Sequence, residues 1–394
     1  MHFAPLTKTQ RADWREMLNA ADHVKLAIAA VVFLFSALTL PLAHIRELAG
    51  LYLVCAVIFY YSITHSIASL LLVALPGSLL FGISSILSTP LALPACYAAL
   101  LLGSLTGAFL IVNLRSVKRG LPLLALPVAA YLIAFFFTQK PIDCLLVLLP
   151  VCIAAVMAYC VLTCRPLTPS VVLIATVTAV VAASAWLISL AVTGWPDANP
   201  LVALVEEIRA TFVSLYEQGL AVYEEQGILL GISDTSIENA AALLGNILPG
   251  LFCMLCLVLS FSLWRMLLRL LTAWQTLPRI PARLSGMTIS AISAGLFVLT
   301  FVISLFANRD DVTLAGMVCS NLILVLEPAL ALAGFSALLT PGKARSCLSL
   351  LLAGGLFVLF IGYPSVGLSL AAFVGAFHIL LSRFLPSSHD KGES

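Results

Sequence analysis

Charged residues are scarce in this sequence. Asp, Glu, Lys and Arg together make up 10% of its 394 residues, hydrophobic residues make up 62%, and the mean hydropathy is +1.12. In a soluble domain about a quarter of the residues are charged, so the composition excludes a soluble protein. The formal net charge of +2 is also too small for a nucleic-acid-binding surface, and we expect no nucleic-acid partner.

Recognisable catalytic and metal-binding motifs are missing as well. The sequence has no P-loop, no G-x-S-x-G, no H-E-x-x-H and no cluster of His and Asp inside an apolar run. Its ten cysteines lie in or beside apolar segments, which favours buried thiols over a disulfide framework. Cys253 and Cys256 have C-x-x-C spacing, but no histidine lies near them. We therefore expect no enzyme, no metal and no cofactor.

Apolar runs of membrane-spanning length recur along the chain. About 20 apolar residues cross a bilayer core, and without water the backbone must bond to itself, so each run should be a helix. The sequence predicts an all-α, polytopic transmembrane bundle of about 12 spans, with 10 or 11 as alternatives because Pro76 and Gly77 interrupt the third run. The expected segments are 26–43, 48–64, 67–88, 91–112, 121–137, 142–163, 170–192, 241–264, 286–306, 314–340, 346–363 and 365–384.

One polar stretch divides these segments into two sets. Residues 194–240 carry eight acidic side chains and one basic residue, Arg209. The expected organisation is an N-terminus (1–25), a first bundle of about seven spans (26–193), the acidic stretch (194–240), a second bundle of about five spans (241–385) and a tail (386–394).

The distribution of Lys and Arg predicts the orientation. Basic clusters follow segments four, eight, ten and twelve, whereas the alternate loops hold little basic charge. With twelve spans, all these clusters and both termini lie on one side, which the positive-inside rule assigns to the cytoplasm. We therefore expect a multi-pass protein of the cell membrane, of bacterial origin, with both ends in the cytoplasm.

The N-terminal 25 residues have two interpretations. Apolar residues at helical spacing predict a short amphipathic helix on the inner membrane surface, and the alternative is a solvated tail. Trp195 and Trp264, at segment ends, fit an aromatic belt at the membrane interfaces. Gly103 and Gly107 form a G-x-x-x-G motif, which predicts close packing of segment four against a neighbouring helix.

The acidic stretch itself predicts an extracytoplasmic amphipathic helix of about six turns, from its i, i+3, i+4 apolar pattern. Its packing face should include Ile208, Phe212 and Leu215, with the glutamates on the opposite face. The helix is expected to act as a lid or docking surface, or as a strut joining the two bundles. Thr235 to Glu238 match a capping box, which should begin the helix that enters segment eight.

Glu327 and Pro328 form the strongest single signal for a site. Glu327 lies near the middle of segment ten and is the only acidic residue well inside an expected span. Such a carboxyl is costly and usually faces a cavity or a partner. Pro328 cannot donate to the carbonyl of Leu324, so we expect a kink or break at mid-membrane, as in transporter ion sites. The alternative is a protonated glutamate beside a static kink.

Three further residues are candidates for the same solute or proton site. Asn246 lies in a Gly- and Pro-containing stretch of segment eight, where local unwinding or a simple kink is expected. Asn321 precedes Glu327 by six residues and should face another direction. His378 is expected at the same depth as Glu327, about 20 Å into the membrane, where the two would share a proton. The alternative is that His378 never meets Glu327.

The last third of the chain, from Ser320 and Asn321 through Glu327 to Gly334, with Gly354-Gly355 and Tyr363-Pro364, resembles the YybS-like family of uncharacterised bacterial membrane proteins. The resemblance lies mainly in the layout of apolar helices around one polar helix and implies no activity. The N-terminal part is remotely similar to substrate-binding subunits of vitamin transporters, which favours transport.

These observations lead to two functional hypotheses. The first is an integral membrane protein that binds or translocates a small solute, as a secondary transporter or a transporter subunit. The second is a non-catalytic scaffold that docks an envelope complex through its acidic outer helix. The expected partners are the lipid bilayer, a small solute or proton, and another membrane protein.

Overall fold

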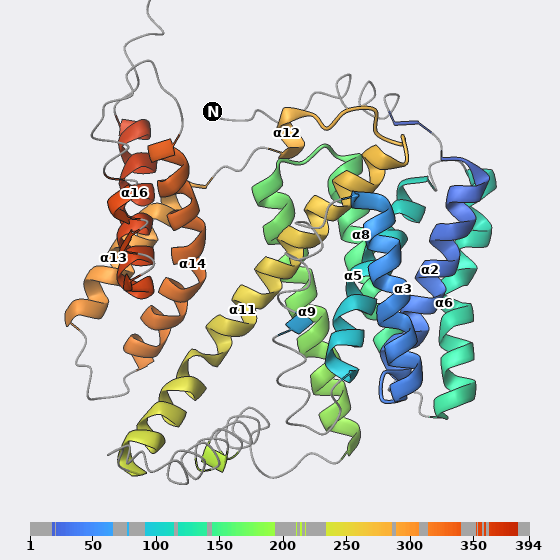
Figure 1. Ribbon diagram of the computed structural model, residues 1–394, viewed down its shortest axis with the longest axis horizontal. Helices are drawn as coiled ribbons and strands as arrows, with labels where there is room; N and C mark the ends of the chain where they lie inside the picture. The colour runs from blue at the N-terminus through green and yellow to red at the C-terminus, as the bar shows by residue number, and fades with distance from the viewer. Residues whose placement is uncertain are drawn as a thin grey trace, which may run out of the picture. The chain divides into compact units, whose positions relative to one another are not determined.

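The computed structural model is helical throughout the residues that it describes (Figure 1). These residues are 18–19, 21–65, 77–78, 91–113, 117–139, 144–193, 234–285, 289–306, 314–339 and 362–384, with isolated positions 210, 213–214, 217, 352, 354–356 and 358–359. The elements are α2 (His23–Leu42), α3 (Arg46–Thr64), α5 (Ala92–Asn113), α6 (Val117–Thr138), η1 (Leu145–Val147), α8 (Leu148–Leu162), α9 (Leu167–Thr193), α11 (Asp234–Ala273), α12 (Ala282–Ser285), α13 (Ala291–Phe306), α14 (Leu314–Leu339) and α16 (Pro364–Phe384).

The helices have the length and composition of membrane spans. Within the described residues, seven helices are long and apolar enough to cross a bilayer, and three shorter apolar helices accompany them. These ten coincide with expected segments, while segment three and segment eleven lie largely outside the described residues. The all-helical membrane fold is thus established, whereas the count of twelve stays a prediction.

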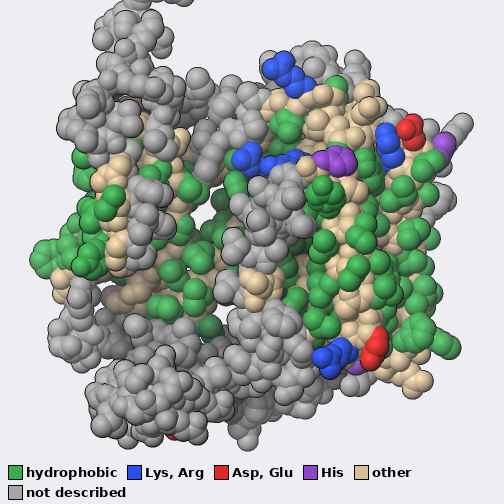
Figure 2. Space-filling view, in the orientation of Figure 1, with side chains coloured by type: hydrophobic (Ala, Val, Ile, Leu, Met, Phe, Trp, Pro, Cys, Tyr) green, Lys and Arg blue, Asp and Glu red, His purple; other side chains and the backbone are tan. Residues whose placement is uncertain are grey.

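The space-filling view agrees with this assignment. Over the helices of the N-terminal part, hydrophobic side chains form a band, and charged side chains gather at its two ends (Figure 2). Many large apolar side chains of these helices are exposed, such as Phe136 of α6 and Leu51 of α3. Exposed apolar surface of this extent is suited to contact with lipid chains.

Two compact units make up the fold. Unit 1 comprises residues 1–194 and 256–287, and unit 2 comprises residues 195–255 and 288–394. This division differs from the two expected bundles, because the boundary falls inside α11. That helix has 40 residues and continues nine residues beyond the expected end of segment eight, so Arg265 and Arg269 lie on the helix and not in a loop.

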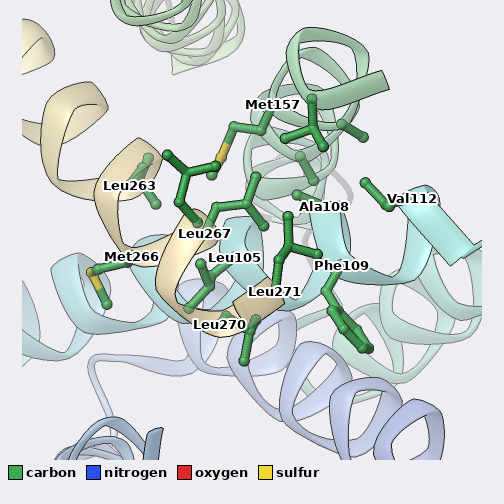
Figure 3. Packing of buried hydrophobic residues seen from close by; sticks show 14 of the residues in the cluster. Leu105, Ala108, Phe109, Val112, Met157, Leu263, Met266, Leu267, Leu270 and Leu271 are labelled. Atoms are coloured by element: carbon green, nitrogen blue, oxygen red, sulfur yellow. The ribbon is translucent and has the colours of Figure 1, made fainter. Parts of the chain in front are cut away.

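The second half of α11 contributes to the core of unit 1. Its leucines Leu263, Leu267, Leu270 and Leu271 are fully buried. Figure 3 shows them packed with side chains of α5 and α8, among them Leu105, Ala108, Phe109, Val112 and Met157. Burial of this kind holds residues 256–273 in unit 1, although the sequence places them after the acidic stretch.

Trp264 lies in this core and not in an interfacial belt. Its side chain is fully buried, and Nε1 donates to the carbonyl oxygen of Leu284 at 3.1 Å. The expected belt position is therefore wrong for Trp264. The reason is that α11 does not end near this residue, so the indole faces the neighbouring helices.

The two glycines of the G-x-x-x-G motif lie where α5 meets its neighbours. A Cβ atom on Gly103 would approach Ser36 of α2 and Pro150 of α8 to 3.2 Å, and one on Gly107 would approach Ala154 of α8 to 2.9 Å. A side chain at Gly107 would therefore force its neighbours apart, and one at Gly103 would be tightly packed. The structure places the pair against α2 and α8 at once.

The described part of the N-terminus packs on protein. Leu18 and Ala21 are buried. The backbone N–H of Asn19 donates to the Thr276 carbonyl at 2.9 Å, and Lys25 Nζ donates to the Trp274 carbonyl at 3.1 Å. These carbonyls follow the end of α11, where no helical donors remain. Residues 1–17 lie outside the described residues, so both expectations for the N-terminus, a surface helix and a solvated tail, stay predictions.

Nine cysteines are described, and all are free thiols. Cys144, Cys160, Cys164, Cys256 and Cys319 are buried, as expected, but Cys55 and Cys253 are exposed on the surface of their helices. The expectation of uniformly buried thiols is therefore wrong for these two residues. Apolar surface in a membrane span can face lipid, so a thiol there needs no protein neighbour.

In unit 2, α14 and α16 lie in close contact and run parallel. A Cβ atom on Gly375 of α16 would lie 2.7 Å from the backbone nitrogen of Gly334 of α14, and one on Gly334 would lie 2.9 Å from that of Gly375. Seven residues earlier in α14, Glu327 contacts Ser369, which is six residues earlier in α16. This is the direction that twelve spans predict for two alternate segments.

Helix α13 packs on the same pair through aromatic rings. Phe297 and Phe301 of α13 make edge-on contacts with Phe373 of α16, with ring centroids 5.3 and 4.6 Å apart. Small side chains of α14 and α16, such as Ala331, Ala371 and Ala372, complete this core. Unit 2 thus holds α14 against both of its neighbours.

Candidate functional site

Glu327 makes its hydrogen bond to a serine of the neighbouring helix. Ser369 Oγ of α16 donates to Glu327 Oε1, and both residues are half-buried. Around them lie apolar side chains of the two helices, including Leu326, Leu330 and Leu368. A single hydroxyl therefore hydrogen-bonds one oxygen of a half-buried carboxyl group.

No basic side chain among the described residues pairs with this carboxylate. An ion pair of unit 1, by contrast, joins Lys25 and Asp22, with 3.3 Å between Nζ and Oδ2. A carboxylate that is fully buried in a protein is normally paired, and Glu327 is half-buried. Glu327 has a neutral hydroxyl donor in that place, so its charge is not compensated by the described side chains.

Pro328 leaves α14 unbroken. The helix runs continuously from Leu314 to Leu339 with Pro328 inside it. The expected break is therefore absent, because the packing of α14 against α13 and α16 on both sides of the proline holds the helix together. The chemical effect of the proline remains: Pro328 has no N–H, so the carbonyl of Leu324 has no helical donor.

Asn321 binds the backbone of α11 at a second proline. Its Nδ2 donates to the carbonyl oxygen of Asn246 at 2.8 Å, and its Oδ1 accepts the N–H of Gly250. These two backbone groups are four residues apart, and they would bond each other in a regular helix. Pro249 precedes Gly250 and removes the neighbouring backbone donor. The amide of Asn321 thus clamps α11 at the turn that Pro249 weakens.

The expected local unwinding of this stretch is absent. Residues 245–250 remain helical inside α11, with Pro249 as an internal proline. A second donation from Asn321 Nδ2, to the Met317 carbonyl of its own helix at 2.7 Å, fixes the amide in place. The side chain of Asn321 supplies the hydrogen bonds that a loop would otherwise have to find, so no unwinding is needed.

The two polar side chains of α14 serve different neighbours. Asn321 contacts α11, and Glu327 contacts α16. Six residues correspond to about 600° of helical rotation, or two-thirds of a turn beyond one full turn. The expectation that the two residues face different directions is met, and they do not form one joint site.

His378 does not form the expected pair with Glu327. It lies nine residues after Ser369 on α16 and is exposed. Nine residues turn the helix by about 900° and advance it by about 13 Å, which puts His378 on the opposite face and well below the carboxyl group. The equal-depth estimate is wrong because α14 and α16 are staggered. Glu327 lies 13 residues after Leu314, but its partner Ser369 lies only five residues after Pro364.

The sequence alone did not single out Ser369, Gly334 or Gly375 as determinants of this site. Ser369 is one of three serines in α16, with Ser365 and Ser382, and nothing local distinguishes it. Gly375 lies four residues after Ala371, and Gly334 lies three residues after Ala331, and small residues at such spacing favour close packing. That pattern was the available signal for the α14–α16 contact.

The expected packing face of the outer helix lies outside the described residues. This applies to Ile208, Phe212 and Leu215. Of the same stretch, Ala210, Ser214 and Glu217 are described as helical and exposed. The lid, docking and strut interpretations of this helix therefore all stay predictions.

Comparison with known protein families places the chain in one of them. A family model described as "Predicted membrane protein (DUF2232)" matches residues 108–346, which is more than half of the sequence. The chain belongs to this family. The match establishes a membrane-protein family, which is the coarser part of the expected resemblance. Neither a curated protein nor a solved structure matches the chain.

The region shared with the family contains most of the candidate site. It includes α11 with Asn246 and Gly250, and it includes Asn321, Glu327 and Pro328 of α14. It ends before α16, so Ser369 and Gly375 lie beyond it. The clamp of Asn321 is thus a feature of the family region, whereas the hydroxyl partner of Glu327 comes from outside that region.

Proposed function

We propose that this membrane protein translocates a small solute and that the Glu327 carboxyl group is the charge-carrying group of its working cycle. The observation that carries the proposal is the Glu327–Ser369 hydrogen bond, in which a neutral hydroxyl stands where a structural carboxylate would have a base. A carboxylate without a fixed counter-charge in hydrocarbon is stable only when a mobile cation or proton neutralises it.

The surroundings of Glu327 suit such a role. Pro328 leaves the carbonyl of Leu324 without its helical donor, one turn earlier on the same helix as the carboxyl group, and transporters use free backbone carbonyls for coupling ions. The half-buried state of Glu327 leaves the group reachable. We also propose that the transported solute is a small molecule and that the protein works with another membrane protein. The resemblance of the N-terminal part to vitamin-transporter subunits favours transport over the scaffold hypothesis.

The experiment is a solute screen on the purified protein in liposomes. Vesicles with a trapped pH-sensitive dye, on a solid-supported electrode, are exposed to pools of amino acids, nucleosides, sugars, organic acids and vitamins. We expect at least one pool to evoke a current or a pH change. That response should vanish in Glu327→Gln and persist in Glu47→Gln, a matched change of an exposed glutamate in the first turn of α3.

Two outcomes would count against the proposal. If no pool evokes a response from folded parent protein, translocation is rejected and the scaffold hypothesis takes its place. If Glu327→Gln responds as the parent does, the carboxyl group is not the charge carrier. A scaffold should tolerate Gln at this position, because a neutral side chain in the same space preserves the helix packing.

A further inference from the structure

Glu327 and Ser369 bring two side-chain oxygen atoms together, and Pro328 leaves a third oxygen, a backbone carbonyl of the same helix, without its helical donor. Oε1 accepts from Ser369, which leaves Oε2 and the lone pairs of the Ser369 hydroxyl for another partner. The third oxygen is the carbonyl of Leu324, four residues before Pro328. In a helix a carbonyl points toward the residue four positions later, and positions 324 and 327 lie on one face. The Cβ atom of Glu327 also tilts back toward that carbonyl.

The charge of this oxygen set selects the kind of ion. The set contains one carboxylate and two neutral oxygens, so its formal charge is −1. A monovalent cation would neutralise it, whereas a divalent cation would leave a net charge among apolar side chains such as Leu326 and Leu368, which is costly. All three ligands are oxygen atoms, with no nitrogen or sulfur among them, and hard cations prefer oxygen ligands.

The stagger of the two helices places Glu327 near the beginning of α16. Ser369 lies five residues after Pro364, which is about 7.5 Å from the start of α16. Ser365 lies one helical turn nearer that end on the same face, and it is exposed. On α14, the exposed Ser320 lies two turns before Glu327 on the same face. Two exposed hydroxyl groups thus lie on the same helix faces as Ser369 and Glu327.

We infer that Glu327, Ser369 and the Leu324 carbonyl form a binding site for a single sodium ion. The inference rests on the proposed function in that sodium would be the coupling ion of the transport cycle. A proton alone would need only the carboxylate. The Ser369 hydroxyl and the Leu324 carbonyl, which Pro328 leaves without a donor, add two oxygens that a proton does not require. A sodium ion would use them in place of its water shell.

The site is tested by binding, without any transported solute. Parent protein in nanodiscs is heated in NaCl, KCl or choline chloride of equal ionic strength, and binding of radioactive ²²Na⁺ is measured by scintillation proximity. We expect a saturable rise of Tm with NaCl that KCl does not reproduce, and competition as the pH is lowered. Glu327→Gln should abolish both signals, and Ser369→Ala should weaken binding about tenfold, as loss of a supporting ligand typically does.

Two control variants separate the site from general packing effects. Ser369→Thr keeps the hydroxyl and should retain sodium binding. Ser382→Ala is a matched change on the same helix, where the hydroxyl is exposed and bonds to the Ile379 carbonyl at 2.8 Å. It should bind sodium as the parent does. The Tm in KCl reports for every variant whether the fold is intact.

Pro328→Ala is the sharpest variant. It restores an N–H at position 328, which would engage the Leu324 carbonyl and remove it from the site. We expect sodium affinity to fall about tenfold, while the Tm in KCl stays equal or rises. A merely structural proline predicts unchanged sodium affinity.

The outcomes that overturn the site are clear. They are a parent protein without a sodium-specific Tm shift, a Glu327→Gln variant that binds ²²Na⁺ normally, or a Pro328→Ala variant with parental affinity. The site and the transport proposal fail separately. Sodium binding without any solute response rejects transport alone, and a Glu327-dependent solute response without sodium binding rejects the sodium site alone.

Discussion

The side-chain oxygen of Asn321 on α14 accepts the backbone N–H of Gly250 on α11, while the same amide donates to the carbonyl of Asn246. One side chain thereby engages both ends of a hydrogen bond that a regular helix would make internally. It does so next to Pro249, where α11 has already lost one donor. The clamp explains how α11 remains a continuous helix of 40 residues across an internal proline.

The close approach at Gly250 gives the first prediction. A Cβ atom there would lie 3.1 Å from Asn321 Cα and would collide with Asn321 Oδ1. Gly250→Ala should therefore destabilise unit 2 by about 1–3 kcal/mol, as overpacking does. The measurement is the unfolding free energy in a denaturant titration. Gly295→Ala on α13, where nothing lies within 4 Å of the new Cβ, is the matched control and should be neutral or stabilising.

A double-mutant cycle then isolates the clamp. In an Asn321→Ala background, the colliding oxygen is gone and the two backbone groups of α11 can bond each other. Gly250→Ala should then cost less than in the parent, by about 1 kcal/mol. Strict additivity of the two changes would show that the amide of Asn321 does not hold α11.

The α14–α16 contact gives the next prediction. A Cβ atom on Gly375 would collide with the Leu330 carbonyl oxygen and approach the Gly334 nitrogen to 2.7 Å. Backbone atoms cannot move aside as a side chain can, so Gly375→Ala should cost about 3 kcal/mol or more. The expected readout is a large fall in Tm or loss of extractable protein. Gly362→Ala, with open space around its Cβ, should leave the Tm unchanged, and equal effects of both would contradict the packing.

Topology gives a further prediction, carried by the distribution of basic residues. In a cysteine-depleted background, a membrane-impermeant maleimide added from outside should label a cysteine at Ser214 and miss one at Ala282. Ser214 belongs to the acidic stretch, and Ala282 begins α12 among the basic residues that follow α11. The reverse labelling pattern would exclude an arrangement with both ends in the cytoplasm.

Cys164, in the turn between α8 and α9, gives the last prediction. Burial raises the pKa of its thiol, and the positive charge of Arg283 offsets part of that rise. In a variant with Cys164 as the only cysteine, the rate of alkylation should therefore rise only at a pH above the ordinary thiol pKa of about 8.5. Mass spectrometry follows the rate against pH. A rate that levels off at the ordinary thiol pKa would refute the shift, whereas steric shielding alone would slow the rate without moving the profile.

The same shift sets a pH dependence of stability. Because the folded-state pKa is raised, the folded protein holds this proton more tightly than the unfolded chain does. The stabilising contribution is present below the unfolded-state pKa and is lost as the pH rises toward the folded-state pKa. The difference between parent and Cys164→Ala in unfolding free energy should accordingly shrink with rising pH.

The sequence by itself determined the membrane class and the position of most helices. A run of about 20 apolar residues has only one stable conformation in a bilayer, because its backbone must bond to itself. That condition is local, so it can be read residue by residue, and α2, α5, α9, α14 and α16 begin and end close to the expected boundaries. Glu327 and Asn321 stood out for the same local reason, as polar side chains in apolar runs.

Only the tertiary structure decided which groups these side chains meet. The stagger of α14 against α16 follows from contacts between Gly334 and Gly375, which are far apart in sequence. That stagger places Ser369 beside Glu327 and turns His378 away from it. Likewise, the clamp of Asn321 depends on the space that Gly250 leaves on another helix. A partner across helices depends on shape on both sides of the contact, and no periodicity within one helix contains that information.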